Sequence, residues 1–193
     1  MSSLIAIVIA YLLGSISSAI IISKIFKTPD PRTEGSGNAG ATNVLRLAGK
    51  KEAAMVMVGD ILKGLIAVWI GQLFHLGAFW LGIVAFAAVV GHIFPLYFGF
   101  KGGKGVATAV GAILGLSFIS GILVAAAWAA VAFIVRYSSL ASLVAIILAP
   151  IFLLLFAKAA FFIPAVLIAA LVIWKHKENI ERLKNKTESK IEW

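Results

Sequence analysis

The sequence predicts an all-α, polytopic membrane protein with seven transmembrane helices, its N-terminus outside and its C-terminus in the cytoplasm. Composition is the first reason. Of the 193 residues, 62% are hydrophobic and only 13% are charged, whereas soluble domains are typically about 45 to 50% apolar and about 25% charged. The second reason is that uncharged apolar stretches recur along the chain, and the third is that basic residues gather in alternate connections between them. We expect a single transmembrane domain over residues 1–193.

Six apolar stretches are candidate spans: residues 3–23, 53–74, 76–98, 106–135, 140–157 and 159–174. No basic residue precedes the first stretch and no small-residue cleavage site follows it, so we expect a mature span and not a signal peptide. The fourth stretch would make a helix about 45 Å long, which is too long for one ordinary crossing. Ser117, Ser120 and Gly121 predict a break there into two short spans.

The distribution of basic residues favours seven crossings over six, because Lys and Arg accumulate in cytoplasmic loops. With seven crossings, fifteen of the 17 Lys and Arg residues lie on one side of the membrane. Only Lys158 lies on the other side, and Lys63 lies within a span. With six crossings, Arg136 and the basic tail 175–190 would be translocated. We therefore expect function to reside on the cytoplasmic side.

Composition also excludes several kinds of site. The chain has no cysteine, which removes disulfides, thiolate metal ligands and a cysteine nucleophile. Its three histidines are scattered and no carboxylates cluster, so neither a metal site nor a cofactor is indicated. The net charge of +9 is typical of basic loops beside a bilayer, and we expect no nucleic-acid partner.

The first long polar segment, residues 27–51, contains GSGNAGATNVLR. It matches G-x-G-x-x-G literally but follows a charged stretch instead of a strand, so the dinucleotide-binding interpretation lacks its context. Small residues nevertheless let backbone N–H groups approach an anion, and an arginine can bind phosphate with two hydrogen bonds. The alternative is a flexible loop between helices. The candidate anion-binding residues here are Ser36, Gly37, Asn38, Thr42, Asn43 and Arg46.

The second polar segment, GFKGGKGVAT at residues 99–108, leads into a helix N-terminus. It does not match the P-loop spacing. Free N–H groups and the helix dipole still attract anions at such a position. The alternative is a turn whose lysines only set the orientation of the helices in the membrane. Lysines are enough for that purpose, and several glycines are not required. The candidates are Lys101, Gly102, Gly103, Lys104 and Gly105.

The third polar segment, HKENIERL, follows the last span. His176, Asn179 and Ile180 share a helical face by their spacing. A histidine at a membrane mouth can act as a base or as a phosphate donor near neutral pH. The alternative is a solvated charged tail.

Polar residues within or next to the spans complete the expected pocket. Asp60 and Lys63 lie inside the second span at i, i+3 spacing, and we expect them first of all to form a structural pair. His92, before Pro95, is expected to form hydrogen bonds between helices and not to bind a ligand. The residues that open the helix after the basic turn are Arg136, Ser138, Ser139 and Ser142.

Five segments resemble, in the same order, motifs of the bacterial acyl-phosphate:glycerol-3-phosphate acyltransferases: GSGNAGATNVLR, DILKG, GHIFPLYFGFKGGKGVAT, RYSSL and HKENIERL. That family consists of seven-helix inner-membrane enzymes, and the resemblance covers essentially the whole chain. It implies transfer of a fatty acyl group from acyl phosphate to the 1-hydroxyl of sn-glycerol 3-phosphate, giving lysophosphatidic acid and inorganic phosphate without a cofactor. It also implies a site on the cytoplasmic face of the bacterial inner membrane, among membrane lipids, and a soluble acyl-phosphate-forming enzyme as a partner.

The resemblance assigns roles residue by residue. It implies that Ser36 and Arg46 are essential, that the loop from Gly102 to Gly105 holds a phosphate, and that His176 and Asn179 are catalytic. With Lys104 as a second phosphate-neutralising cation, these form the expected catalytic set, and Ser139 and Ser142 are added as substrate-binding residues. Glu181 is implied to be structural.

Chemistry favours direct attack of the hydroxyl on the acyl phosphate, because this mixed anhydride already carries a competent leaving group. His176 or a substrate phosphate would then accept the hydroxyl proton. One alternative is an acyl-enzyme formed on Ser36. A second is a membrane anion or phosphate transporter, although the interrupted helices in two related halves that are typical of transporters are not evident. The H-x-x-x-x-D motif of many acyl-CoA acyltransferases is absent, since His92 and His176 are followed at that spacing by Tyr97 and Glu181.

Overall fold

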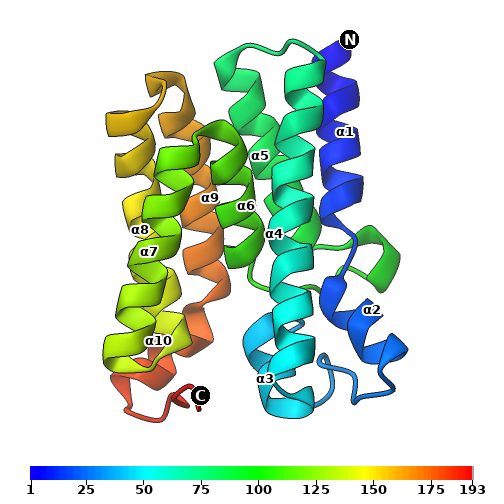
Figure 1. Ribbon diagram of the computed structural model, residues 1–193, viewed down its shortest axis with the longest axis vertical. Coiled ribbons are helices and arrows are strands. Elements are labelled where there is room, and N and C mark those ends of the chain that lie inside the picture. Colours follow the sequence, from blue (N-terminus) through cyan, green and yellow to red (C-terminus); the bar gives the residue numbers. More distant parts are fainter. Residues whose placement is uncertain (193) are drawn as a thin grey trace.

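The computed structural model describes residues 1–192, and within this range the chain is all helical, without a strand (Figure 1). The elements, in chain order, are α1 (Ser2–Gly14), α2 (Ser18–Ile25), α3 (Ala41–Ala48), α4 (Lys50–Leu73), α5 (Ala78–Ile93), η1 (Leu96–Phe98), α6 (Val106–Leu116), α7 (Phe118–Val135), α8 (Ser138–Phe156), η2 (Ala159–Phe161), α9 (Phe162–Lys175) and α10 (Lys177–Lys184). The N-terminus lies at one end of the bundle, and α2, α3, α10 and the C-terminus lie at the other (Figure 1).

The first predicted span is not one continuous helix. Its backbone leaves the helix between α1 and α2, where the Ser17 side chain caps α2 by accepting from Ile20 N. Ser15 Oγ donates to the Tyr11 carbonyl at 2.8 Å. Serine hydroxyls compete with helical hydrogen bonds and favour caps, and this is why the apolar run is interrupted here.

The predicted break in the stretch 106–135 is confirmed at Ser117. This residue has extended backbone angles, and its side chain caps α7 by accepting from Ser120 N. The third predicted span, 76–98, ends its α-helix earlier than expected, at Ile93. Pro95 explains this end, since proline disfavours helical geometry in the residue before it.

Close approach of α4 and α6 forms the centre of the bundle. A Cβ added to Gly64 would lie 2.2 Å from the Thr108 carbonyl oxygen, and one added to Gly111 would lie 1.9 Å from that of Ile61. Glycine thus lets the two backbones touch, as small residues do in membrane helix packing. In Figure 1, α1 lies on one side of this pair, and α7, α8 and α9 lie on the other.

Five helical segments of residues 1–192 are long and apolar enough to cross a membrane, or up to six if the bent pair α9 and α10 is counted as one. The two members of that pair meet at 59°. α6 has only 11 residues, about 16 Å of helix, and falls short of a full crossing. An integral membrane protein is therefore supported, whereas seven crossings and the orientation of the termini remain predictions. The termini lie at opposite ends of the bundle, as an odd number of crossings requires (Figure 1).

Candidate functional site

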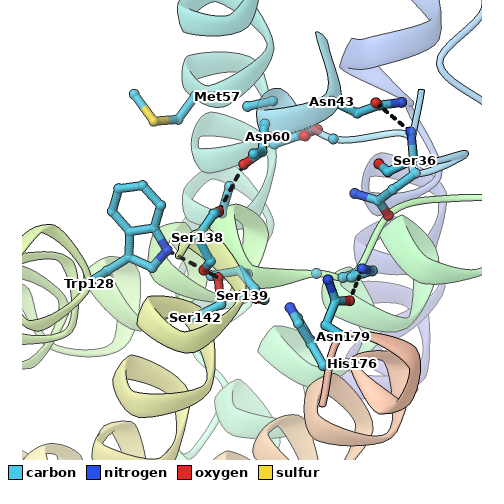
Figure 2. Close-up of a pocket in the computed structure, with 18 of the residues that line it drawn as sticks. Ser36, Asn43, Met57, Asp60, Trp128, Ser138, Ser139, Ser142, His176 and Asn179 are labelled. Carbon is cyan, nitrogen blue, oxygen red and sulfur yellow. Dashed lines mark hydrogen bonds between the residues drawn. The ribbon is translucent and has the colours of Figure 1, made fainter. Parts of the chain in front are cut away.

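A cavity of about 710 Å³ opens among α3, α4, α6, α8 and α10, and it gathers the three polar segments singled out in the sequence (Figure 2). Its polar lining includes Ser36, Asn38, Thr42, Asn43, Arg46, Asp60, His92, Lys104, Ser138, Ser139, Ser142, His176, Asn179, Arg182, Glu188 and Ser189. Its apolar lining includes Met57, Ile61, Val106, Ala107, Val110, Ala125 and Trp128. One cavity therefore offers both anion-binding groups and an apolar wall.

Asn43 organises the loop that carries Ser36. It is buried, and its Oδ1 accepts from the backbone N–H of Ser36 at 2.9 Å. Its Nδ2 donates to the carbonyls of Pro31 and Glu34 at 2.9 and 3.0 Å. A Cβ at Gly35, which has a φ of 64°, would lie 2.3 Å from Asn43 Oδ1. Because both amide donors are used within the loop, Asn43 shapes the site instead of offering the free donor that the sequence suggested.

A chain of hydroxyl groups joins α3 to α8 along another wall of the cavity. Thr42 Oγ1 and Ser138 Oγ are 2.9 Å apart. Ser142 Oγ donates to the Ser138 carbonyl at 2.7 Å and accepts from Trp128 Nε1 at 3.1 Å. Figure 2 shows Trp128, Ser138 and Ser142 on one side of the opening, with Ser36 and Asn43 across from them. The serines that begin α8 therefore lie at the level of the first polar loop, as predicted.

Lys104 and Asn179 meet directly, since Lys104 Nζ donates to Asn179 Oδ1. The amide of Asn179 is oriented by Glu188, whose Oε1 accepts from Nδ2 at 2.7 Å, while Glu188 Oε2 binds Arg182 Nε at 2.7 Å. Burial, reinforced by the positive charge of Arg182, lowers the pKa of Lys104 from 10.5 to about 8. The ammonium is thus still charged at neutral pH but poorly hydrated, which strengthens its attraction for an anion.

His176 lies at the bend between α9 and α10 and is 3% exposed. Burial lowers the pKa of its ring from 6.5 to about 4, despite the hydrogen bond with the Val172 carbonyl. Nδ1 lies 2.8 Å from that carbonyl oxygen, which can only accept, so Nδ1 carries the proton. Nε2 is then an unprotonated acceptor, on a ring that points toward the opening in Figure 2.

The other predicted residues divide into two groups. Asn38, Arg46, Gly105 and Ser139 line the cavity, and Arg46 is exposed to solvent. Four others are not part of the lining: Gly37, Lys101, Gly102 and Gly103. Gly102 and Gly103 instead pack against His92, where a Cβ would lie 2.0 Å from His92 O and 2.2 Å from His92 Nε2 respectively. Glu181, the expected structural glutamate, is exposed.

Sequence reasoning did not single out Arg182, Glu188, Ser189 or Trp128, all of which line the cavity. Helical spacing could have predicted Arg182 as a lining residue, since it lies three residues after Asn179 and hence on the same helical face. No sequence pattern predicted Glu188 as a lining residue, because it lies in the polar tail that follows α10. The expected Asp60–Lys63 pair is present at 2.9 Å, and His92, expected only in helix packing, also faces the cavity.

Among residues 1–192, no group of three His, Asp or Glu side chains is arranged to hold a metal ion.

Comparison with known proteins gives concordant matches. A family described as glycerol-3-phosphate acyltransferase matches residues 4–186. A protein of Coxiella burnetii (strain Dugway 5J108-111) named glycerol-3-phosphate acyltransferase is 51% identical over 191 residues, which is 99% of both chains. One of the same name from Vibrio cholerae serotype O1 (strain M66-2) is 48% identical over 185 residues, 96% of this chain and 88% of that protein.

The solved structures agree with these matches. The crystal structure of PlsY (YgiH), an integral membrane glycerol 3-phosphate acyltransferase, in its glycerol 3-phosphate form superimposes with a TM-score of 0.93 at 40% identity, over 100% of this chain and 96% of that one. Its lysophosphatidic acid form gives a TM-score of 0.91 over 98% and 95% of the two chains. The resemblance noted in the sequence is confirmed over the full length.

Proposed function

The chain belongs to the glycerol-3-phosphate acyltransferase family, and from that membership we propose that it transfers a fatty acyl group from acyl phosphate to the 1-hydroxyl of sn-glycerol 3-phosphate. Acylation of glycerol 3-phosphate to lysophosphatidic acid is the activity that the relatives and the two solved forms support. It is the first step in making a phospholipid from this acceptor. The names of the relatives give the acceptor but not the donor, and acyl phosphate as the donor is part of the proposal.

The observation that carries the proposal is the presence of two cationic regions at one cavity. Arg46, on α3, lines the cavity together with the loop that carries Ser36. Lys104 lines it together with Asn179 and Arg182. Two anionic substrates must meet in such a reaction, and each needs a positive partner. The apolar wall formed by α4, α6 and α7 suits an acyl chain. A transporter is not supported, since the relatives and structures described above are named as acyltransferases.

In the proposed reaction, the 1-hydroxyl oxygen attacks the acyl carbon, and the bond from that carbon to the phosphate oxygen breaks. His176 Nε2 accepts the hydroxyl hydrogen bond and orients the nucleophile. Because the pKa of His176 is only about 4, the ring is a weak base, and the proton ends on the departing phosphate. Lys104 and Arg46 neutralise the phosphates and position both substrates.

We prefer direct transfer to an acyl-enzyme on Ser36. A serine nucleophile needs a base within hydrogen-bonding distance. The interaction that the structure gives for Ser36 is the one from its backbone N–H to Asn43, an amide that cannot serve as a base. Ser36 is therefore better suited to donate to a phosphate oxygen.

We further infer that the cavity opens to the cytoplasm of a bacterial cell, at its inner membrane. The charge asymmetry supports this orientation, because the polar loops that build the cavity also carry most of the 17 basic residues. A soluble enzyme that forms acyl phosphate would then meet this basic end of the bundle and supply the donor there.

The deciding experiment is to supply the purified protein with acyl phosphate and glycerol 3-phosphate and to measure lysophosphatidic acid and inorganic phosphate. We expect the two products in equal amounts, and no product when acyl-CoA replaces acyl phosphate. Lys104→Ala should lower kcat/KM by about 10- to 150-fold, the equivalent of a lost charge-assisted hydrogen bond. Lys177→Ala, an exposed neighbour on α10, is the matched control and should have little effect. Product formation from acyl-CoA alone would refute the proposed donor.

A further inference from the structure

Three ionisable side chains gather inside the bundle beside the cavity: Asp60 and Lys63 on α4, and His92 on α5. They are 2%, 6% and 7% exposed. Lys63 Nζ lies 2.9 Å from Asp60 Oδ1 and donates at 2.7 Å to the Ile16 carbonyl, at the break between α1 and α2. His92 Nδ1 lies 3.6 Å from the same carboxylate oxygen, which is beyond hydrogen-bond distance, so the contact between the two side chains is electrostatic.

Folding alone does not account for this cluster. A buried ion pair is weak evidence of stabilisation, because the lost hydration of both ions offsets their attraction. Ionisable groups within a membrane protein accordingly point to function. Lys63 alone balances the charge of Asp60. His92 is therefore not needed as a counter-charge, and its place in the cluster calls for another explanation. Asp60 and His92 line the cavity, whereas Lys63 does not.

His92 is also the surface on which the loop before Lys104 rests. The backbone N–H of Gly103 donates to the His92 carbonyl at 3.3 Å. The close fit of Gly102 and Gly103 against the carbonyl and the ring leaves no space for a larger residue at either position. His92 therefore packs directly against the backbone immediately before Lys104.

We propose that Asp60 is a positioning residue for acyl transfer, which holds the His92 ring so that His92 in turn aims the Lys104 ammonium into the cavity. Lys63 compensates the charge of the carboxylate and ties it to the break between α1 and α2. Asp60 itself forms and breaks no bond in the reaction. The inference rests on the function proposed above, in which Lys104 must face a substrate phosphate, and small misplacements of such a group cost much of its effect.

A double-mutant cycle tests the link between Asp60 and Lys104. The variant Asp60→Asn/Lys63→Met removes the carboxylate together with its counter-charge, so no unpaired ion is left buried. We measure kcat/KM for the wild type, this variant, Lys104→Ala and the combination. The fold-loss of kcat/KM caused by Lys104→Ala should be about 10-fold smaller in the double variant than in the wild type, because the ammonium is already misplaced in the double variant. An equal cost in both backgrounds would overturn the proposal.

Two further variants keep the test decisive if that variant does not fold. His92→Gln removes the intermediate ring and should reduce the cost of Lys104→Ala in the same way. Gln72→Leu is the matched control, because Gln72 lies at the opposite end of α4 and donates to the Gly115 carbonyl at 2.8 Å. It should lower thermal stability and leave the cost of Lys104→Ala unchanged. If His92→Gln folds and Lys104→Ala still lowers kcat/KM as much in this background as in the wild type, the positioning role is refuted.

Failure of the proposed donor would be recognised separately, since the wild type would then make no lysophosphatidic acid from acyl phosphate. The double-mutant cycle would in that case be measured with the acyl donor that the wild type does use, and its outcome would still test the positioning role of Asp60.

Discussion

Single residues in this site are largely defined by the hydrogen bonds that they already make. Asn43 uses both amide donors within its own loop, so it cannot offer them to a substrate. His176 uses Nδ1 on the Val172 carbonyl and keeps Nε2 as an acceptor. Lys104 donates to Asn179 and has further N–H groups for a phosphate. What each side chain contributes thus follows from its partners as well as from its type.

Alkaline pH should switch off the contribution of Lys104. Its pKa is lowered to about 8, so the ammonium is present below that pH and is lost as the pH rises through it. The profile of kcat/KM, which reports groups of the free enzyme, should therefore fall with a limb near pH 8. Lys104→Arg keeps a positive charge throughout and should move this limb upward. A limb that stays near pH 8 in Lys104→Arg would assign it to another group.

Ser36 should acquire no acyl group when acyl phosphate is supplied without glycerol 3-phosphate. Direct transfer needs no covalent intermediate, and the hydrogen bond that the structure gives for Ser36 runs from its backbone N–H to an amide oxygen, which is not a base. Intact-mass measurement of the incubated protein should show the unmodified mass. An adduct on Ser36 that glycerol 3-phosphate then discharges would instead establish the acyl-enzyme route.

At the scale of elements, short segments outside the main helices complete the cavity. One is α3, which lies within a segment that the sequence suggested to be a loop. Another is the C-terminal strap, residues 186–191, which follows α10 and carries Glu188. Arg136 holds this strap twice, because its Nε and Nη2 donate to the Ile191 carbonyl at 3.2 and 3.0 Å and its own carbonyl accepts from Ile191 N at 2.7 Å.

Loosening the strap should disable the site. Ile191 is 4% exposed and packs against Ala132 and Ala141. Ile191→Ala should remove about 2 to 5 kcal/mol of packing, enough to undock a short strap and to withdraw Glu188 from Asn179. We expect lower acyltransferase activity and faster proteolysis of the tail, both measured beside Lys186→Ala, an exposed residue of the same strap. Normal activity in a protein whose tail is cleaved would show that the strap is dispensable.

In the whole molecule, the three polar segments adjoin α4, α6 and α9 in the sequence. They meet because these helices present the adjoining ends at the same end of the bundle. Figure 1 shows α3 and α10 at the same end, although they are far apart in the sequence. The site therefore belongs to the bundle as a whole and not to any one loop. Its position at the basic end is the reason to expect substrates from the cytoplasm.

Topology can be tested directly, because the chain has no cysteine of its own. Single cysteines at Thr33 and Lys184 should be protected from an impermeant thiol reagent in intact cells, while one at Gly77 should react. All three positions are exposed in the structure. Reaction of the Lys184→Cys variant from outside would contradict an odd number of crossings with an outer N-terminus.

Hydropathy and motif order are enough to predict the helical, membrane-embedded class, a helix break among Ser117, Ser120 and Gly121, and the polar segments that line the cavity. Hydropathy, chain length and motif order are properties of the chain in one dimension, so they can be interpreted without coordinates. The break at residues 15–17 was missed because serines that compete with helical hydrogen bonds are tolerated in many spans.

Which side chains can reach a substrate depends instead on how the helices pack. Glu188 orients Asn179, Asn43 is occupied by its own loop, and the glycines before Lys104 serve the fit against His92. Each of these facts depends on the distance between atoms that the bundle brings together from separate segments. Hydrogen bonds and steric exclusion act over a few ångströms, and no pattern along the chain encodes such a distance until the helices have packed.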